Sequence, residues 1–185
     1  MFAHKNRGFS LLELMIVVAV AAILINMALP SFTSFINSQE RRGALHDLMG
    51  VFAFARQHSV MNGAIVTVCP LDTTGTCGKD WNDDIHVFLD PDNTRKLIAN
   101  ERLLRTISPS GNGRLVARSL NRSFFQFRPT GFIHSDLGNI TWCPESRDAS
   151  LAGQIIISRG GRVRIAKDTD NDGIPEDSKG RPISC

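Results

Sequence analysis

The most regular feature of the sequence is an apolar stretch near its beginning. From residue 9 to residue 29 the only polar side chains are Ser10, Glu13 and Asn26. An α-helix needs about 20 such residues to cross the hydrocarbon core of a bilayer. The pattern therefore predicts a transmembrane helix over residues 9–29, preceded by a short basic segment at residues 4–7.

After Pro30 the pattern changes to a helix with one apolar face. Because helical spacing resumes beyond the proline, we expect Pro30 to kink the helix rather than end it. Asn62-Gly63 is a stop signal, since glycine readily takes the left-handed conformation after a last helical turn. At 1.5 Å per residue, a helix over residues 9–62 is roughly 80 Å long. Its amphipathic half, residues 30–62, carries apolar residues at Phe32, Phe35, Ile36, Leu45, Leu48, Met49, Phe52 and Ala55.

Beyond Gly63 the pattern becomes that of short β-strands. Residues 65–69 are rich in β-branched side chains and are followed by Pro70, which is typical of a strand and its end. Further strands alternate with turns of Asp, Asn, Gly and Pro. We therefore predict an α+β fold in which an antiparallel β domain, residues 63–185, docks on the long helix. The other expected strands are residues 85–89, 103–107, 115–118, 124–128, 154–158 and 162–166.

Glu13 is the anomaly of the apolar stretch, because a carboxylate at mid-membrane depth costs roughly 2.5–3.5 kcal/mol and implies a partner. A secretory signal peptide, cut near Ala19-Val20-Ala21, would hold Glu13 inside its apolar centre. An ordinary membrane anchor leaves the carboxylate unexplained. Cleavage after Gly8 would instead make Phe9 the new N-terminus, and its amine and Glu13 could neutralise one another between neighbouring subunits.

The segment Gly8-Phe9-Ser10-Leu11-Leu12-Glu13 resembles the leader junction of type IV prepilins and type II secretion pseudopilins. The resemblance implies that residues 1–8 form a leader, which the prepilin peptidase removes after Gly8. It also implies methylation of the Phe9 amine and a role for Glu13 in docking the subunit into a filament. Residues 9–29 would then be held in the inner membrane before assembly and in the filament core afterwards. The C-terminal domain would lie in the periplasm.

Later segments are similar to one branch of these proteins, the GspH/FimT/FimU minor pilins and pseudopilins. Residues 81–90 resemble a tryptophan segment that leads into a strand and an acidic turn, although Asp84 and Ile85 stand where the family usually has a glycine and an aromatic residue. Residues 127–132 resemble a Phe-x-Pro-x-Gly element. Cys143 and residues 155–158 and 161–164 follow in the expected order. The resemblance implies a pilin-like fold for the whole chain.

The cysteines add information on compartment and cross-links. Four cysteines without a C-x-x-C pair suit an exported domain with two disulfides. Four cysteines allow three connectivities. We favour Cys69–Cys77, which would close a short loop, and Cys143–Cys185, which would tie down the C-terminus.

Overall charge is uninformative, at +3 in 185 residues, but the charges are unevenly distributed. Residues 71–92 are acidic and residues 102–128 are basic. The basic run suggests either solvated strand faces or a surface for nucleic acid or another subunit. Its aromatic residues are expected in the core rather than as a stacking platform, because the phenylalanines alternate along the predicted strand. These residues are Phe124, Phe125, Phe127 and Phe132.

Arg162 and Arg164 are the candidate DNA-binding residues. On a strand both would face one side, about 6.6 Å apart, and guanidinium groups suit bidentate phosphate contacts. The resemblance to FimT-like proteins implies that this Gly-Arg-x-Arg motif captures DNA during natural transformation. The alternatives are a charged edge strand that resists aggregation and a structural motif of the whole family.

Asp168, Asp170 and Asp172 place oxygen ligands at the first, third and fifth positions of a loop, with Gly173 at the sixth. A calcium loop wraps its ion in this way. Glu176 stands at the ninth position. The twelfth position is Lys179 rather than glutamate, which excludes a complete EF-hand but not a partial calcium site. The alternative is a solvated acidic turn. No other cofactor is expected.

The sequence contains none of the common catalytic motifs, such as H-E-x-x-H, G-x-S-x-G or a phosphate loop, and an enzyme is not expected. We expect a minor pilin that joins other minor and major pilins and helps initiate a type IV pilus near its tip. One alternative is an H-type minor pseudopilin of a type II secretion system. The other is a DNA-binding pilus subunit for DNA uptake in natural transformation.

Overall fold

The computed structural model describes residues 10–185 except 110 and 121, together with all their side chains but those of residues 27–31. The chain divides into two units, Met1–Ile36 and Asn37–Cys185. One helix, α1 (Leu11–Asn62), belongs to both, and the proline within it does not end it. Gly63 follows with a φ of 59°, so the predicted left-handed stop is confirmed.

The first unit exposes its apolar side chains. The large apolar residues from Leu11 to Ile25 are each 50–77% exposed. In the parts of the chain that the structure describes, no helix combines the length and the hydropathy of a membrane-spanning segment.

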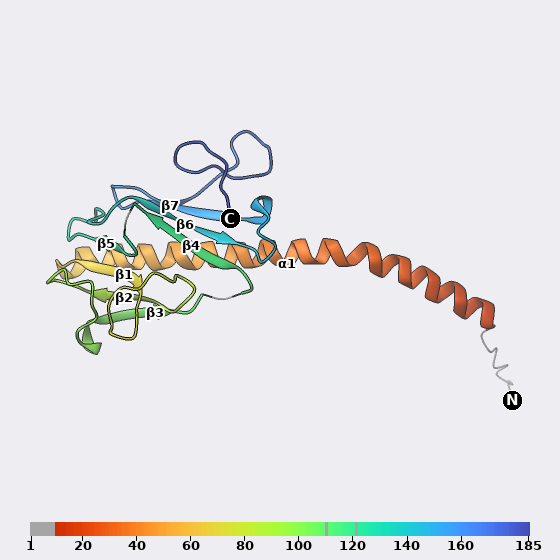
Figure 1. Ribbon diagram of the computed structural model, residues 1–185, viewed down its shortest axis with the longest axis horizontal. Helices are drawn as coiled ribbons and strands as arrows, with labels where there is room; N and C mark the ends of the chain where they lie inside the picture. Colours follow the sequence, from red (N-terminus) through yellow and green to blue (C-terminus); the bar gives the residue numbers. More distant parts are fainter. Residues whose placement is uncertain (1–9, 110, 121) are drawn as a thin grey trace, which may run out of the picture. The chain divides into compact units, whose positions relative to one another are not determined.

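The second unit packs two antiparallel sheets against α1, and the predicted α+β fold is confirmed (Figure 1). The first sheet has the strand order β3-β2-β1-β5, and the second has the order β4-β6-β7-β8. Their strands are β1 (Val66–Pro70), β2 (Ile85–Leu89), β3 (Leu103–Ile107), β4 (Arg114–Ser119), β5 (Phe125–Phe127), β6 (Gly138–Cys143), β7 (Gly153–Ile157) and β8 (Val163–Ile165). Two short 3-10 helices, Asn100–Arg102 and Ala149–Leu151, precede β3 and β7.

The core lies between α1 and the inner faces of the two sheets. Phe52 of α1 is fully buried and packs edge-on against Phe125 and Phe127 of β5, with ring centroids 5.3 and 6.2 Å apart. Trp81 also packs edge-on against Phe125, with ring centroids 5.6 Å apart. Each large side chain buried in this way contributes about 1.5–3 kcal/mol, so the aromatic cluster is a main anchor of the sheets on the helix.

Two features of the second unit differ from the sequence prediction. The strand β6 was not predicted, because its first residues, Gly138 and Asn139, have low β-propensity. Its hydrogen bonds to β4 and β7 make it a strand in spite of this weak local signal. Phe132 was expected in the core but is 54% exposed. It lies in the connection after β5, where Ile133 pairs with Phe127 and takes the inward position instead.

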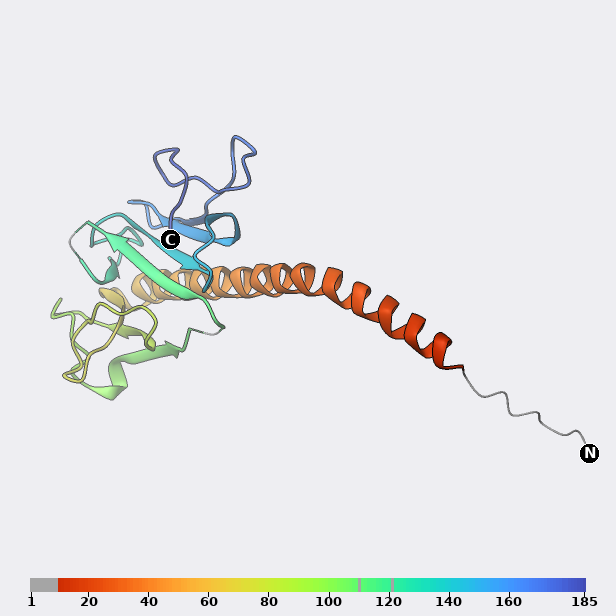
Figure 2. The same cartoon turned by 45° about the vertical axis from the view of Figure 1, so that its right-hand side comes forward.

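Both disulfides are present with the pairing favoured from the sequence. Cys69–Cys77 closes the loop after β1, with Cα atoms 5.5 Å apart. Cys143–Cys185 joins β6 to the last residue, with Cα atoms 5.6 Å apart. The segment after β8 therefore returns to the second sheet, and the C-terminus lies beside it in both ribbon views (Figure 2).

Candidate functional site

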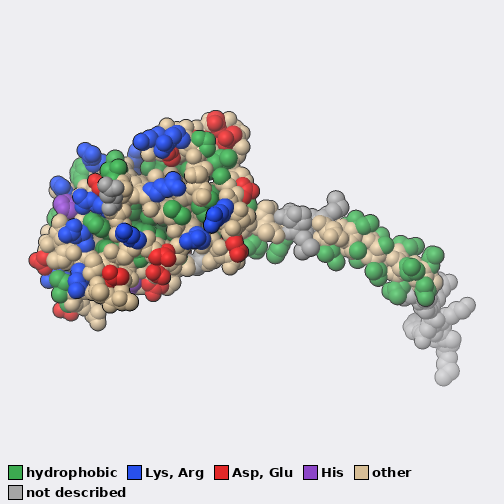
Figure 3. Space-filling view, viewed as in Figure 1, with side chains coloured by type: hydrophobic (Ala, Val, Ile, Leu, Met, Phe, Trp, Pro, Cys, Tyr) green, Lys and Arg blue, Asp and Glu red, His purple; other side chains and the backbone are tan. Residues whose placement is uncertain are grey.

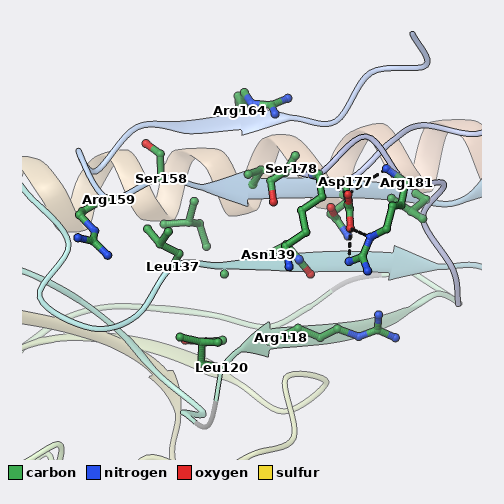
Figure 4. A pocket seen from close by; sticks show the side chains of 18 of the residues that line it. Arg118, Leu120, Leu137, Asn139, Ser158, Arg159, Arg164, Asp177, Ser178 and Arg181 are labelled. Atoms are coloured by element: carbon green, nitrogen blue, oxygen red, sulfur yellow. Dashed lines mark hydrogen bonds and ion pairs between the residues drawn. The ribbon is translucent and has the colours of Figure 1, made fainter. Parts of the chain in front are cut away.

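A wide groove of about 1030 Å³ crosses the outer face of the second sheet. Successive side chains of a strand point to opposite faces of a sheet. Val163 and Ile165 of β8 accordingly pack on the core, while Arg164 between them lines the groove. Figure 4 shows Arg118 of β4, Asn139 of β6 and Arg164 arranged around this groove. The C-terminal segment closes it from one side.

The groove is basic. Six of its lining residues carry positive charge and one, Asp177, carries negative charge. Lys and Arg side chains are spread over the same face in the space-filling view (Figure 3). The cations come from four separate parts of the chain, and this arrangement is not visible in the sequence. They are Arg118, Arg122, Arg159, Arg164, Lys179 and Arg181.

Two of these cations are neutralised by neighbours. Arg181 donates to Asp177 at 2.8 Å, and this hydrogen bond lowers the pKa of the Asp177 carboxyl below its ordinary value. Arg122 pairs with Asp136 at 2.9 Å. Among the described residues, the other four groove cations form no ion pair. The groove therefore presents uncompensated positive charge to solvent.

The two arginines of the Gly-Arg-Val-Arg motif line different grooves. Arg162 precedes β8 and lines a different groove, which α1 borders with Arg56 and Met61. Only Arg164 lies in the basic groove. That both arginines share one strand face stays a prediction, because the strand begins at Val163, one residue after Arg162.

The motif glycine has a structural role. Gly161 has a φ of 74°, and a Cβ there would collide with the backbone carbonyl oxygen of Gly131. Gly131 belongs to the Phe-x-Pro-x-Gly element, so two segments singled out in the sequence meet in space. Their close approach needs glycine whatever the arginines bind.

Glu13 lies in the first turn of α1, where its backbone N–H donates to the Ser10 hydroxyl at 3.2 Å. Ser-x-x-Glu at a helix start is the sequence of a capping box, and the structure shows the half of it that Ser10 supplies. The predicted cleavage and methylation residues, Gly8 and Phe9, lie outside the described residues.

The acidic loop after β8 brings its predicted ligands together. Carboxylate oxygens of Asp168, Asp170, Asp172 and Glu176 all lie within 4.8 Å of one another. The sequence pattern placed the three aspartates and Glu176, and the fold buries Glu176.

Comparison with known proteins agrees with the fold. Residues 44–161 match the family model described as type II transport protein GspH, and residues 3–28 match the prokaryotic N-terminal methylation motif. No curated protein matches the sequence.

The solved structures that resemble the chain include two of a minor pilin and one of a minor pseudopilin. Two are crystal structures of the type IV minor pilin FimU of Pseudomonas aeruginosa. They have TM-scores of 0.53 and 0.54 and identities of 16% and 18%, and the matches cover 78% and 82% of this chain and 98% of each FimU chain. The minor pseudopilin EpsH of Vibrio cholerae has a TM-score of 0.49 and 8% identity, over 68% of this chain and 95% of its own. The chain belongs to the GspH family of type II pseudopilins and type IV minor pilins, which are non-enzymatic structural subunits.

Proposed function

We propose that the protein is a minor pilin that joins other pilins near the tip of a type IV pilus and helps to initiate its assembly. The proposal rests on the exposed apolar surface of the first unit. Its helix presents apolar side chains on every side from Leu11 to Ile25, with Glu13 as the one acidic side chain of that segment. Contiguous apolar surface of this size marks an interaction surface, and a filament of packed helices would bury it.

The methylation motif supports processing by the prepilin peptidase, and the family supports other pilins as partners. The two FimU structures belong to a type IV minor pilin, which favours a pilus. The name of the family model favours the second candidate, a minor pseudopilin of a type II secretion system. In either case the unassembled subunit would be held in the inner membrane by residues 9–29.

Deletion of the gene separates the two machines. We expect the deletion strain to lose most surface pili, because initiation fails, and to secrete its type II substrates normally. Pili are counted by shearing and electron microscopy, and secretion is measured in the culture supernatant. Restoration by the intact chain is the control. Normal piliation with lost secretion would contradict the pilus proposal and support the pseudopilin.

The basic groove favours DNA uptake as a further candidate function. Arg118, Arg159, Arg164 and Lys179 form no ion pair among the described residues, and they line one open face. Cations that neutralise backbone phosphates release counterions, which supplies most of the affinity for DNA of any sequence. The candidate DNA contact is therefore Arg164 with its groove neighbours rather than the pair Arg162 and Arg164.

A charge-matched pair of variants tests this candidate. Arg118→Gln/Arg164→Gln should weaken duplex binding by the detergent-solubilised chain and reduce the slope of log K against log salt by about 2, since each phosphate contact contributes about 0.9. Arg105→Gln/Arg162→Gln removes the same charge outside the groove and should bind nearly as the parent chain does. Affinity is measured by fluorescence anisotropy between about 50 and 200 mM salt. Equal losses in the two variants would rule out the groove as the DNA site.

A further inference from the structure

The segment after β8 is a closed loop whose ends are fixed. Ala166 donates to the Gln154 carbonyl of β7 at 2.8 Å, and Glu176 donates to the Lys167 carbonyl at 3.0 Å. Further along, Ile183 donates to the Pro175 carbonyl at 2.9 Å, and Cys185 is bonded to Cys143. Residues 168–176 thus form a loop held at its base by backbone hydrogen bonds, and its side chains are held in a defined arrangement.

The aspartates of this loop point their carboxylates to a common centre. Asp168 accepts from the backbone N–H groups of Asn171 and Gly173 at 2.7 and 2.9 Å, and Asp172 accepts from Ile174 at 2.7 Å. These bonds turn the backbone around the carboxylates, with φ values of 63° at Asn171 and 90° at Gly173. Gly173 takes this conformation without the steric cost of a side chain.

Glu176 supplies an independent indication that the loop takes a ligand. Its side chain is only 6% exposed. One carboxylate oxygen, Oε2, accepts from the Thr169 N–H and hydroxyl at 2.7 and 2.8 Å. The other, Oε1, is buried and has no hydrogen-bond partner. A buried oxygen of a carboxylate without a partner is costly, and buried charges are normally paired or coordinate a metal.

No protein cation fills this role among the residues that the structure describes. The three ion pairs found there involve none of the four carboxylates, and Arg181, the nearby arginine, is committed to Asp177. Four carboxylates whose oxygens lie within 4.8 Å of one another repel each other unless a cation lies between them.

We propose that this loop binds one calcium ion through Asp168, Asp170, Asp172 and Glu176. Calcium takes oxygen ligands at about 2.3–2.6 Å, so two oxygens on opposite sides of the ion are about 4.6–5.2 Å apart. The four ligand oxygens, all within 4.8 Å of one another, can therefore reach one such ion. Magnesium demands octahedral geometry at about 2.0–2.1 Å and keeps several waters rather than an all-protein ligand set, so a site of four carboxylates favours calcium. Glu176 provides the buried glutamate that an EF-hand has three positions later, where this chain has Lys179.

The ion would stabilise the whole C-terminal segment. Glu176 is both a ligand of the proposed ion and one partner of an isolated β-bridge to Pro182. The residues between these two include Lys179 and Arg181, which line the basic groove. A bound cation would therefore couple the calcium concentration to the order of one wall of that groove.

Titration calorimetry tests the proposal. Calcium chloride is titrated into the full chain, oxidised and solubilised in detergent. After treatment with a chelator, we expect one site with a Kd of about 0.1–1 mM, the range of extracellular calcium modules. The melting temperature should rise by several degrees at about 10 mM calcium, because only the folded loop binds the ion. The same concentration of magnesium should raise it much less.

Two loop variants and one control complete the test. Asp170→Asn removes an exposed charge, and Glu176→Gln removes the buried one with little change of shape; each should weaken calcium binding about tenfold or more, since affinity depends on ligand charge. Asp83→Asn removes an exposed carboxylate outside the loop and should bind as the parent chain does. Absence of calcium binding up to about 10 mM, or unchanged affinity in Asp170→Asn, would overturn the proposal.

Discussion

A chain carrying Glu13→Ala should reach the membrane fraction in normal amounts and be absent from sheared pili. Removing the carboxylate makes the apolar segment easier to insert, because a charge opposes insertion, by roughly 2.5–3.5 kcal/mol at mid-membrane depth. Incorporation should fail because we expect this carboxylate to pair with the amine that cleavage after Gly8 creates on a neighbouring subunit. Immunoblots of membranes and of purified pili measure the two steps separately.

Glu13 also lies in the first turn of α1, and a matched variant separates the effect of its charge from an effect on the helix start. Glutamine also completes a capping box with Ser10, so Glu13→Gln keeps the helix start and loses only the charge. It should fail to assemble as Glu13→Ala does. Asn26→Ala is the control within the same segment, because the Asn26 amide already donates to Ala22 of its own helix at 2.7 Å. Normal incorporation of Glu13→Gln would show that the charge is not needed.

The largest expected effect on stability is that of Asp90→Ala. Asp90 is only 1% exposed, and its carboxylate accepts five hydrogen bonds. Two come from side chains of neighbouring strands, Thr67 at 2.9 Å and Gln126 at 3.2 Å. The other three come from the following turn: the Thr94 N–H and hydroxyl at 2.8 and 3.1 Å, and the Arg95 N–H at 2.9 Å. Alanine would leave these donors unpaired and release the turn that holds Arg95 at a φ of 58°. We expect the free energy of unfolding to fall by about 3–5 kcal/mol.

Asp72→Ala is the matched control for Asp90→Ala. Asp72 also accepts three hydrogen bonds from its own loop, two from Thr74 and one from Thr76, and these bonds lower its pKa. Its donors can bond to water instead because the loop is exposed, so the loss should be much smaller. Denaturant unfolding followed by fluorescence suits both variants, since Trp81 and Trp142 are buried. Equal losses would show that burial does not set the cost.

The periodicities of the sequence predicted the large elements well. The helix from residue 9 to 62, its stop at Gly63 and most strands follow from local patterns of apolar and polar residues, and α1 and seven of the eight strands lie where these patterns put them. The exception, β6, carries weak local signals and is defined by hydrogen bonds to β4 and β7. The exposure of Phe132 was likewise not predictable from local pattern, because this residue lies in the connection after β5 and not in a strand.

The candidate site was predictable only in part. The leader junction, Glu13, the cysteines and the aspartates of the acidic loop are short-range motifs whose residue types suffice to suggest their chemistry. The basic groove is different: Arg118 and Arg164 are far apart in the chain and meet because β4, β6, β7 and β8 are neighbours in one sheet. Arg162 directly precedes β8 and lines a different groove, beside α1.

The sequence by itself determined the class of protein, since the apolar helix with its single early carboxylate and the processing motif are contiguous and need no folding to be read. Only the tertiary structure decided which charges act together. It buried Asp90 among donors from three segments, left Asp72 in solvent, and closed Glu176 over three aspartates. The physical reason is that the energy of a charge depends on its burial and on its neighbours, and strand pairing, rather than order along the chain, sets both.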